Sequence, residues 1–176
     1  MRSLRGMDLR PTADRLRETL FNVLCAGNPA ALEGTVWFDL YAGTGAVGIE
    51  ALSRGAKMVH FVESAAKAAE LVRENLRSLE IQGGFEVVQL DVSRALQQLS
   101  SKGVVADFVF LDPPYRMQSA YRETLDLLAS SRSVGQSTII IAEHEKRFDP
   151  GEVFGFLGRT RKLEQGDAAL SFYRRV

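Results

Sequence analysis

The residues with the clearest chemical potential are Asp112-Pro113-Pro114-Tyr115, which follow the apolar run at residues 108–111. A run of this kind is typical of a buried strand. Two successive prolines fix two φ angles and remove two N–H donors, so the strand should end at Asp112 in a stiff loop. Such a loop can hold a carboxylate, a proline carbonyl and a tyrosine ring around a flat ligand that carries an amino group. A plain strand-terminating turn is the alternative that this segment alone leaves open.

The chemistry that this loop suits is group transfer to the exocyclic amine of a nucleobase. The lone pair of such an amine is delocalised into the ring, so the nitrogen is a poor nucleophile. If the Asp112 carboxylate and the Pro113 carbonyl hold its two hydrogens, the nitrogen can rehybridise and direct its lone pair at a methyl carbon. Such alignment contributes on the order of 7 kcal/mol or more, and stacking on Tyr115 adds roughly 1–3 kcal/mol. A base in structured RNA or DNA must first turn out of its stack.

A glycine-rich loop at residues 43–48, Gly-Thr-Gly-Ala-Val-Gly, follows a β-rich run at residues 35–40. The G-x-G-x-x-G spacing matches the dinucleotide fingerprint, and Glu63 lies about 20 residues after the first glycine, where an acid binds ribose hydroxyls. On its own, this motif also fits a nicotinamide or flavin enzyme.

Two further acids favour a different cofactor. Asp39, at the end of the first strand, would repel a pyrophosphate and attract a sulfonium with its α-amino group. Asp91 follows the third strand, where it can accept from an adenine amine, although a helix N-cap explains it equally well. Together with the glycines these acids predict S-adenosylmethionine. The predicted cofactor-binding residues are Asp39, Tyr41, Ala42, Gly43, Thr44, Gly45, Glu63, Asp91 and Val92.

The elements that must position these residues alternate between strand and helix from residue 35 to residue 142. Besides the runs named above, the expected strands include residues 58–62 and residues 138–142. This alternation predicts a mostly parallel sheet with helices on both faces, and ligands bind such a sheet at the carboxyl ends of its strands. Because the candidate residues above lie at the end of a strand or directly after one, we expect them to meet at one rim. Beyond residue 150 the short runs at 154–157, 160–163 and 169–173 predict an antiparallel ending.

The composition is that of one ordinary globular domain spanning residues 1–176. No apolar run is long enough to cross a membrane, and the single Cys25 fits a reduced cytoplasm. The net charge is zero, but residues 1–17 contain five arginines, and basic residues also gather at 157–176. We expect these two ends to meet a polyanion, if there is one; the alternative is that they are only solvated.

Several segments resemble the RsmD family of bacterial ribosomal RNA methyltransferases. They are the Arg-Pro-Thr-Ala-Asp-Arg signature with its continuation at residues 10–22, the run at 50–56 and the ending at 166–173, besides the motifs above. The resemblance implies a Rossmann-like class I methyltransferase with a mostly parallel seven-stranded sheet, helices on both faces and an antiparallel C-terminal strand. It also implies methyl transfer from S-adenosylmethionine to the N2 amine of a guanine in small-subunit ribosomal RNA.

The same resemblance assigns roles to individual residues. The acids and glycines named above would hold the cofactor, and Asp112, Pro113, Pro114 and Tyr115 would hold the guanine as the catalytic loop. Residues 1–27 would form a basic segment and a helix beside the active site. The substrate-binding residues there would be Arg10, Thr12, Arg15 and Arg17, together with Tyr115. The family usually has a longer basic hairpin before its Arg-Pro-Thr motif, whereas nine residues precede Arg10 here.

Other functions share parts of this pattern. A DNA adenine-N6 or cytosine-N4 methyltransferase also uses the Asp-Pro-Pro-Tyr loop, but it generally needs an added target-recognition region that this length does not provide. A nicotinamide oxidoreductase and a non-catalytic nucleotide-binding scaffold are the remaining alternatives. We expect no metal site, because His60 and His144 are far apart in the sequence. The expected partner is ribosomal RNA within a partly assembled small subunit, bound by a monomer.

Overall fold

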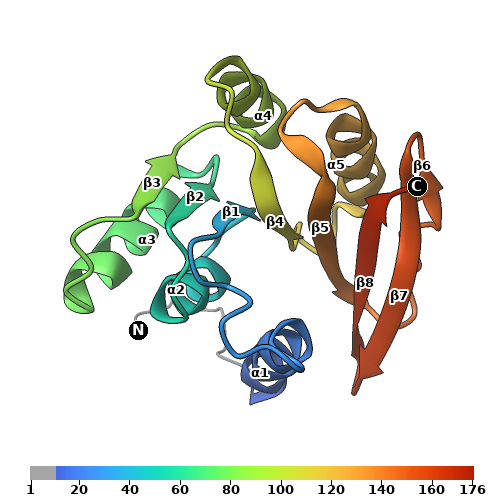
Figure 1. Cartoon of the computed structure of the whole chain (residues 1–176), viewed down its shortest axis with the longest axis horizontal. Helices are drawn as coiled ribbons and strands as arrows, with labels where there is room; N and C mark the ends of the chain where they lie inside the picture. Colours follow the sequence, from blue (N-terminus) through green and yellow to red (C-terminus); the bar gives the residue numbers. More distant parts are fainter. Residues whose placement is uncertain (1–10) are drawn as a thin grey trace.

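The computed structural model describes residues 11–176, and its centre is one eight-stranded sheet (Figure 1). The strand order is β3-β2-β1-β4-β5-β8-β7-β6, in which β1 to β5 pair in parallel and β8, β7 and β6 are added through antiparallel pairings. The strands are β1 (Val36–Leu40), β2 (Met58–Val62), β3 (Phe85–Val88), β4 (Ala106–Leu111), β5 (Val134–Glu145), β6 (Val153–Phe154), β7 (Leu157–Gln165) and β8 (Ala168–Arg175).

Within residues 11–176, five helices cover the two faces of the sheet. They are α1 (Pro11–Leu24), α2 (Ala46–Ser53), α3 (Ala66–Ser78), α4 (Val92–Ser101) and α5 (Gln118–Ser130). The first three helices lie on one side, which we call the α1 face, and α4 and α5 lie on the other, the α5 face (Figure 1). None of the helices within residues 11–176 is both long and apolar enough to span a lipid bilayer.

Strand β4 shows how a nearly continuous apolar sequence serves both faces. Successive side chains of a strand point to opposite sides. Phe108 and Phe110 accordingly join the hydrophobic core of the α1 face, while Val109 and Leu111 join the core of the α5 face. Because both sides of the strand are buried by helices, polar residues are absent from these four positions.

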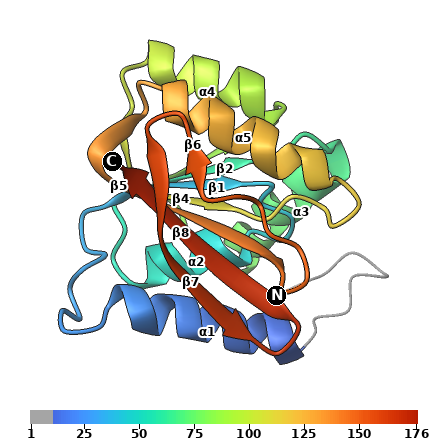
Figure 2. The ribbon, with the colours of Figure 1, turned by 90° about the vertical axis from the view of Figure 1, so that its right-hand side faces the viewer.

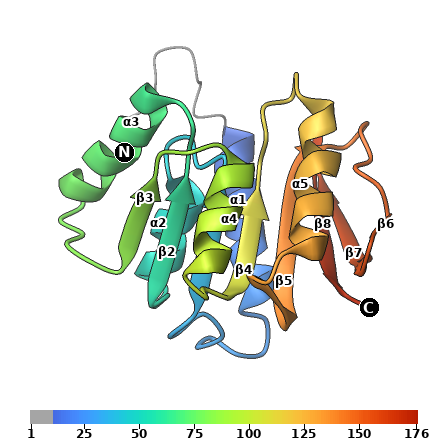
Figure 3. The same cartoon turned by 90° about the horizontal axis from the view of Figure 1, so that it is seen from above.

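Helix α1 is fixed to its face by aromatic stacking. The ring of Phe21 stacks on Trp37 of β1 at a centroid distance of 5.6 Å, and Trp37 stacks on Phe108 at 4.6 Å. Leu16 and Leu20 are also buried in this core. The helix begins at the edge where the parallel strands end (Figures 2 and 3). Its first turns therefore lie beside the rim that the sequence predicts as functional.

The predicted fold class is confirmed, and three details of the sheet differ from the prediction. The sheet has eight strands instead of seven, because the short β6 is added at its edge; the C-terminal β8 is antiparallel to β5, as predicted. The run at 154–157 is not a strand but a tight hairpin, in which Gly155 adopts a φ of 52° between β6 and β7 (Figure 2). The expected strand at 138–142 extends over Val134–Glu145. Its extra residues include exposed polar ones, so they carry no apolar pattern.

Candidate functional site

The loop between β1 and α2 turns sharply at three positions. Tyr41, Gly43 and Gly45 have φ angles of 59°, 57° and 79°, which lie in the left-handed region that glycine adopts at little cost. The N–H of Gly45 donates to the carbonyl of Ala42 at 2.7 Å and closes the turn. A Cβ on Gly45 would lie 3.2 Å from the Val72 side chain, so the loop packs closely on α3. These residues bring the backbone to the rim, as the sequence predicts.

Asp39 lies beneath this loop and fastens it to α2. The residue is only 2% exposed, and its Oδ2 accepts from the N–H of Gly48 at 2.9 Å. Burial raises the pKa of Asp39 to about 8; the Gly48 N–H opposes this shift, and the charges of Asp112 and Glu63 reinforce it. The carboxylate thus shares the rim with two other acids while it holds the start of the helix.

Glu63, at the end of β2, bridges the glycine loop and the beginning of α3. Its Oε2 accepts from the N–H of Gly43 at 3.1 Å, and its Oε1 accepts from the N–H of Ala65 at 3.0 Å. The side chain is only partly buried. A carboxylate in this position is fixed by backbone donors and still accessible at the rim, which suits a contact with ribose hydroxyls.

Asp91 caps helix α4, which is one of its two sequence interpretations, and its contact with an adenine amine stays a prediction. Its Oδ1 accepts from the N–H of Arg94 at 3.0 Å, and Val92 begins the helix as a buried residue.

The Tyr41 hydroxyl lies 2.8 Å from Oγ1 of Thr124 on α5. The ring of Tyr41 therefore reaches toward α5, and its hydroxyl is already paired with Thr124. Any contact of Tyr41 with a cofactor would have to use atoms other than this hydroxyl.

Asp112 directly follows β4, and the two prolines end the strand there as predicted. Pro113 is buried, Pro114 is exposed, and the Pro114 carbonyl accepts from the N–H of Met117 at 2.8 Å in a turn that leads into α5. Tyr115 is 47% exposed at the tip of this turn. Burial raises the pKa of Asp112. The Pro114 carbonyl is thus occupied by the turn, and the loop presents a carboxylate and a tyrosine at the rim.

Glu143 is a site residue that the sequence analysis missed. It follows Ala142 of β5, which is the register partner of Leu111 in β4, so Glu143 continues its strand beside Asp112. Burial and the charge of Asp112 raise the pKa of Glu143, and the charge of Arg17 lowers it. The predicted strand ended at Ala142, which left Glu143 in a loop. The parallel pairing of these two strand ends is the signal that could have identified it.

His144, the next residue of β5, lies on the opposite face of the sheet. It is buried, and its Nε2 lies 2.9 Å from the Ser171 hydroxyl. Its ring also packs edge-on against Tyr121 and Phe148. The residue thus belongs to the core of the α5 face and not to the rim cluster.

The predicted substrate residues on α1 have different surroundings. Arg10 lies outside the described residues, and Thr12 is in the first turn of α1. Arg15 is exposed to solvent. Arg17 forms an ion pair with Asp14, with 3.2 Å between Nη1 and Oδ1, and is close enough to Glu143 to affect its pKa. Of the residues in this group that the structure describes, Arg17 is the one tied to the acidic cluster.

Asn75 supports the glycine loop from below and was also missed. The residue is fully buried on α3, and its Nδ2 donates to the carbonyl of Thr44 at 2.9 Å. In the sequence it interrupts the apolar stripe of α3, and a buried polar residue within such a stripe is itself a signal of a specific partner.

We expect Asn75→Ala to destabilise the loop and to weaken ligand binding at the rim. The substitution leaves a loop carbonyl without its donor, which costs about 1–3 kcal/mol of unfolding free energy. Urea unfolding measures this loss, and Asn22→Ala, an exposed asparagine on α1, is the matched control. Equal stability of the two variants would show that the Asn75 amide does not hold the loop.

Comparison of the sequence with known proteins identifies the family to which the chain belongs. A family model described as Conserved hypothetical protein 95 matches residues 1–174. Ribosomal RNA small subunit methyltransferase D of Escherichia coli strain K12 is 34% identical over 167 residues, which cover 95% of this chain and 80% of that protein. The protein of the same name from Haemophilus influenzae is 35% identical over 144 residues, covering 81% of this chain and 72% of that one.

Solved structures show the same fold. The hypothetical protein TTHA0928 of Thermus thermophilus superposes with a TM-score of 0.79 at 28% identity, covering 100% of this chain and 94% of that chain. The T. thermophilus 16S rRNA N2 G1207 methyltransferase RsmC, in complex with AdoMet and guanosine, has a TM-score of 0.77 at 18% identity; it matches over 97% of this chain and 44% of its own. On the sequence matches, the chain belongs to the Conserved hypothetical protein 95 family, as an RsmD-type methyltransferase.

Proposed function

We propose that this protein transfers the methyl group of S-adenosylmethionine to the exocyclic N2 amine of a guanine in small-subunit ribosomal RNA. The observation that carries the proposal is the pairing of β1 with β4 in the centre of the sheet. This pairing puts the glycine loop after β1 next to the Asp112–Tyr115 loop after β4. A methyl donor held by the first loop would face an amine held by the second.

The donor side of the site is suited to a cationic cofactor with a ribose and an amino group. Glu63 lies at the strand end where ribose hydroxyls bind in such folds. The charges of Asp112 and Glu63 both raise the pKa of Asp39, so these three acids lie near one another at the rim, and this concentration of acids favours a sulfonium over a pyrophosphate. The relative RsmC, which shares the fold, is named as a complex with AdoMet and guanosine, and this supports the choice of cofactor.

On the acceptor side, Asp112 and the Pro113 carbonyl would hold the two hydrogens of the amine. Asp112 would orient the nitrogen and keep its lone pair directed at the methyl carbon. Tyr115, exposed at the tip of the turn, would stack on the base after it has turned out of the RNA. The name of the E. coli relative, a small subunit ribosomal RNA methyltransferase, supports RNA as the polymer.

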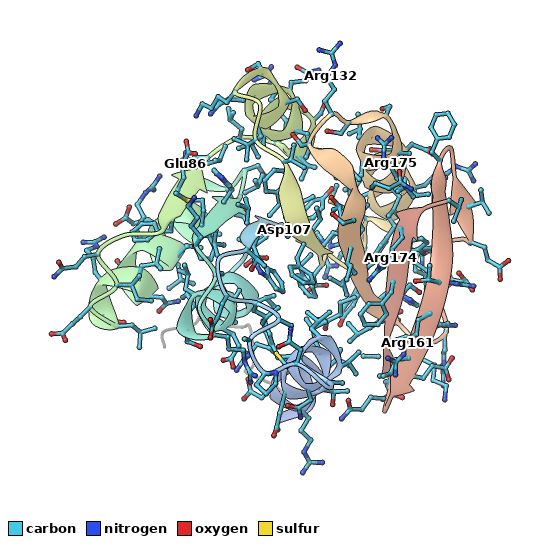
Figure 4. The ribbon with its side chains drawn as sticks, in the orientation of Figure 1. Glu86, Asp107, Arg132, Arg161, Arg174 and Arg175 are labelled. Carbon is cyan, nitrogen blue, oxygen red and sulfur yellow. The ribbon has the colours of Figure 1, made fainter. Side chains whose placement is uncertain are left out.

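Contacts with the RNA backbone are assigned to the basic residues of the α1 face. We propose that residues 1–27 form this part of the single domain 1–176, with Arg10, Thr12, Arg15 and Arg17 nearest the RNA. Arg161 of β7 and Arg174 of β8 are exposed, and Figure 4 shows Arg161 on the side of the sheet nearer α1. Its guanidinium lies 6.0 Å from the centroid of the Phe172 ring, which belongs to the core of the α1 face.

We expect binding to ribosomal RNA to weaken steeply as salt concentration rises, because each phosphate contact releases a counterion. Arg15→Gln should reduce the slope of log affinity against log salt by about 1, the value for one lost phosphate contact. Arg132→Gln is the control, because this exposed arginine lies beside α4 on the opposite side from α1 (Figure 4). Filter binding over a salt series measures both slopes. An RNA affinity that does not depend on salt would show that the arginines do not contact phosphates.

The net charge of zero is low for a protein that binds free RNA on its own. We therefore propose that a monomer acts in the cytoplasm on a partly assembled small subunit, whose bound proteins supply part of the recognition. The test is transfer of labelled methyl groups from S-adenosylmethionine to unmodified small subunits, to naked ribosomal RNA and to DNA. Label in subunits or RNA supports the proposal, and label in DNA alone would contradict it.

A further inference from the structure

The carboxyl groups of Asp112 and Glu143 lie close together, just beyond the last paired residues of β4 and β5. Leu111 of β4 and Ala142 of β5 are register partners, so the residues that follow them continue the two strands in parallel. Neighbouring strands are about 4.8 Å apart. Leu111 and Ala142 belong to the core of the α5 face, and alternation then turns Asp112 and Glu143 toward the α1 face. This is the face on which Asp39 and the glycine loop of the site lie.

The position of Glu143 is fixed independently of its side chain. Its register partner on the other side is Leu170 of β8, which belongs to the core of the α1 face, so the Glu143 side chain has the same direction. The buried Tyr121 hydroxyl donates to the Glu143 carbonyl at 2.8 Å and holds the backbone from the opposite face. Arg17 of α1 is also close enough to lower the pKa of Glu143, which agrees with a carboxyl that is turned toward α1.

These two carboxylates have acceptor capacity to spare. Within residues 11–176, no N–H or O–H group donates a hydrogen bond to the side chain of Asp112 or of Glu143. Arg17 acts on Glu143 as a nearby positive charge and forms its ion pair with Asp14. A half-buried carboxylate without donors is costly unless a ligand supplies them. The pair is therefore suited to a ligand that presents adjacent N–H groups on one edge.

Guanine is the common nucleobase with that edge. Its N1–H lies next to the N2 amine, so one carboxylate can accept from each. Adenine and cytosine instead carry an unprotonated ring nitrogen beside their amine. An ionised carboxylate facing that nitrogen would meet its lone pair and would remain unpaired, which disfavours these bases.

We propose that Glu143 is a specificity-determining residue whose carboxylate accepts the N1–H of the target guanine while Asp112 accepts from the N2 amine. This inference rests on the proposed function and names the feature of the base that the site reads. The Asp-Pro-Pro-Tyr loop selects an amine, and Glu143 selects the donor beside it. Arg17 offsets part of the repulsion between the two acids before the base enters.

The test compares two RNAs that differ only at the modified position. Once the methylated guanine has been mapped, small-subunit RNA is prepared with either guanine or 2,6-diaminopurine there. Both bases carry the N2 amine, but N1 of diaminopurine is an acceptor. The values of kcat/KM on both RNAs are measured for the wild-type protein, for Glu143→Gln and for Glu74→Gln, a control carboxylate exposed on α3. The ratio between the two RNAs is then compared across proteins, so any effect of the analogue on RNA folding cancels.

The wild-type protein and Glu74→Gln should prefer guanine by roughly 10²-fold or more. Glu143→Gln should reduce this preference by at least about 10-fold and should methylate the diaminopurine RNA faster than the wild-type protein does, because an amide can donate to N1. If Glu143→Gln lowers kcat/KM on both RNAs by the same factor, Glu143 has only a structural role and the inference is wrong. If the wild-type protein methylates neither RNA at N2, the proposed function and the inference both fail.

Discussion

Asp112→Ala should abolish methyl transfer while S-adenosylmethionine still binds with nearly its original affinity. The carboxylate ends β4 on the acceptor side of the rim, and the donor loop after β1 is held by other groups, namely Asp39, Glu63 and Asn75. Removing the Asp112 carboxylate leaves the amine without its orienting acceptor, so we expect the rate of methyl transfer to fall on the order of 10³-fold or more. Single-turnover kinetics on small subunits gives the rate, and calorimetry gives the cofactor affinity.

The matched control for this substitution is Asp126→Ala, an exposed acid of α5 that forms a long ion pair with Arg122 at 3.8 Å. This variant should transfer methyl groups at the wild-type rate. A parallel loss of cofactor binding in Asp112→Ala would show that the carboxylate belongs to the donor half of the site. Full activity of Asp112→Ala would show that the Asp-Pro-Pro-Tyr loop does not act in methyl transfer as proposed.

Gly48→Ala should destabilise the fold and weaken cofactor binding together. A Cβ at this position would lie 2.4 Å from Cε1 of Phe61 and 2.7 Å from Cγ1 of Val59, so α2 has to move away from β2. Overpacking of this kind costs about 1–3 kcal/mol of unfolding free energy. The movement also strains the hydrogen bond from the Gly48 N–H to the buried Asp39 carboxylate, which holds the glycine loop in place.

Urea unfolding and calorimetry with S-adenosylmethionine measure these two losses. Gly83→Ala is the control, because a Cβ there would have no neighbour within 4 Å. A Gly48→Ala protein with unchanged stability and affinity would show that the third glycine of the motif is not required for close packing of the helix on the sheet.

The parts of the structure that follow from local sequence were predicted correctly. The β1, β2 and β4 strands are short apolar runs ended by glycine, acid or proline, and each ends where its sequence indicates. The prolines after Asp112 and the glycines at 43 and 45 impose backbone geometry that no tertiary contact has to supply. For this reason the fold class and the position of the rim could be predicted from the sequence.

The parts that were missed depend on pairing between distant segments. Glu143 lies in the site because β5 extends past Ala142 and pairs with β4, and its own neighbours in the sequence do not indicate this. Asn75 supports the loop through a contact 31 residues away. The strand β6 has two residues and exists because the hairpin at Gly155 brings it back onto β7. Such features require the register of the sheet, which sequence patterns leave undetermined.

The identity of the methylated nucleoside tests the central claim most directly. Unmodified small subunits are incubated with labelled S-adenosylmethionine and the protein, and the RNA is then digested to nucleosides and separated. We predict that the label is found in N2-methylguanosine, and that Asp112→Ala produces none of it. Label in N6-methyladenosine or N4-methylcytidine would keep the amine chemistry of the Asp-Pro-Pro-Tyr loop and contradict the guanine assignment, and no transfer to RNA at all would contradict the account as a whole.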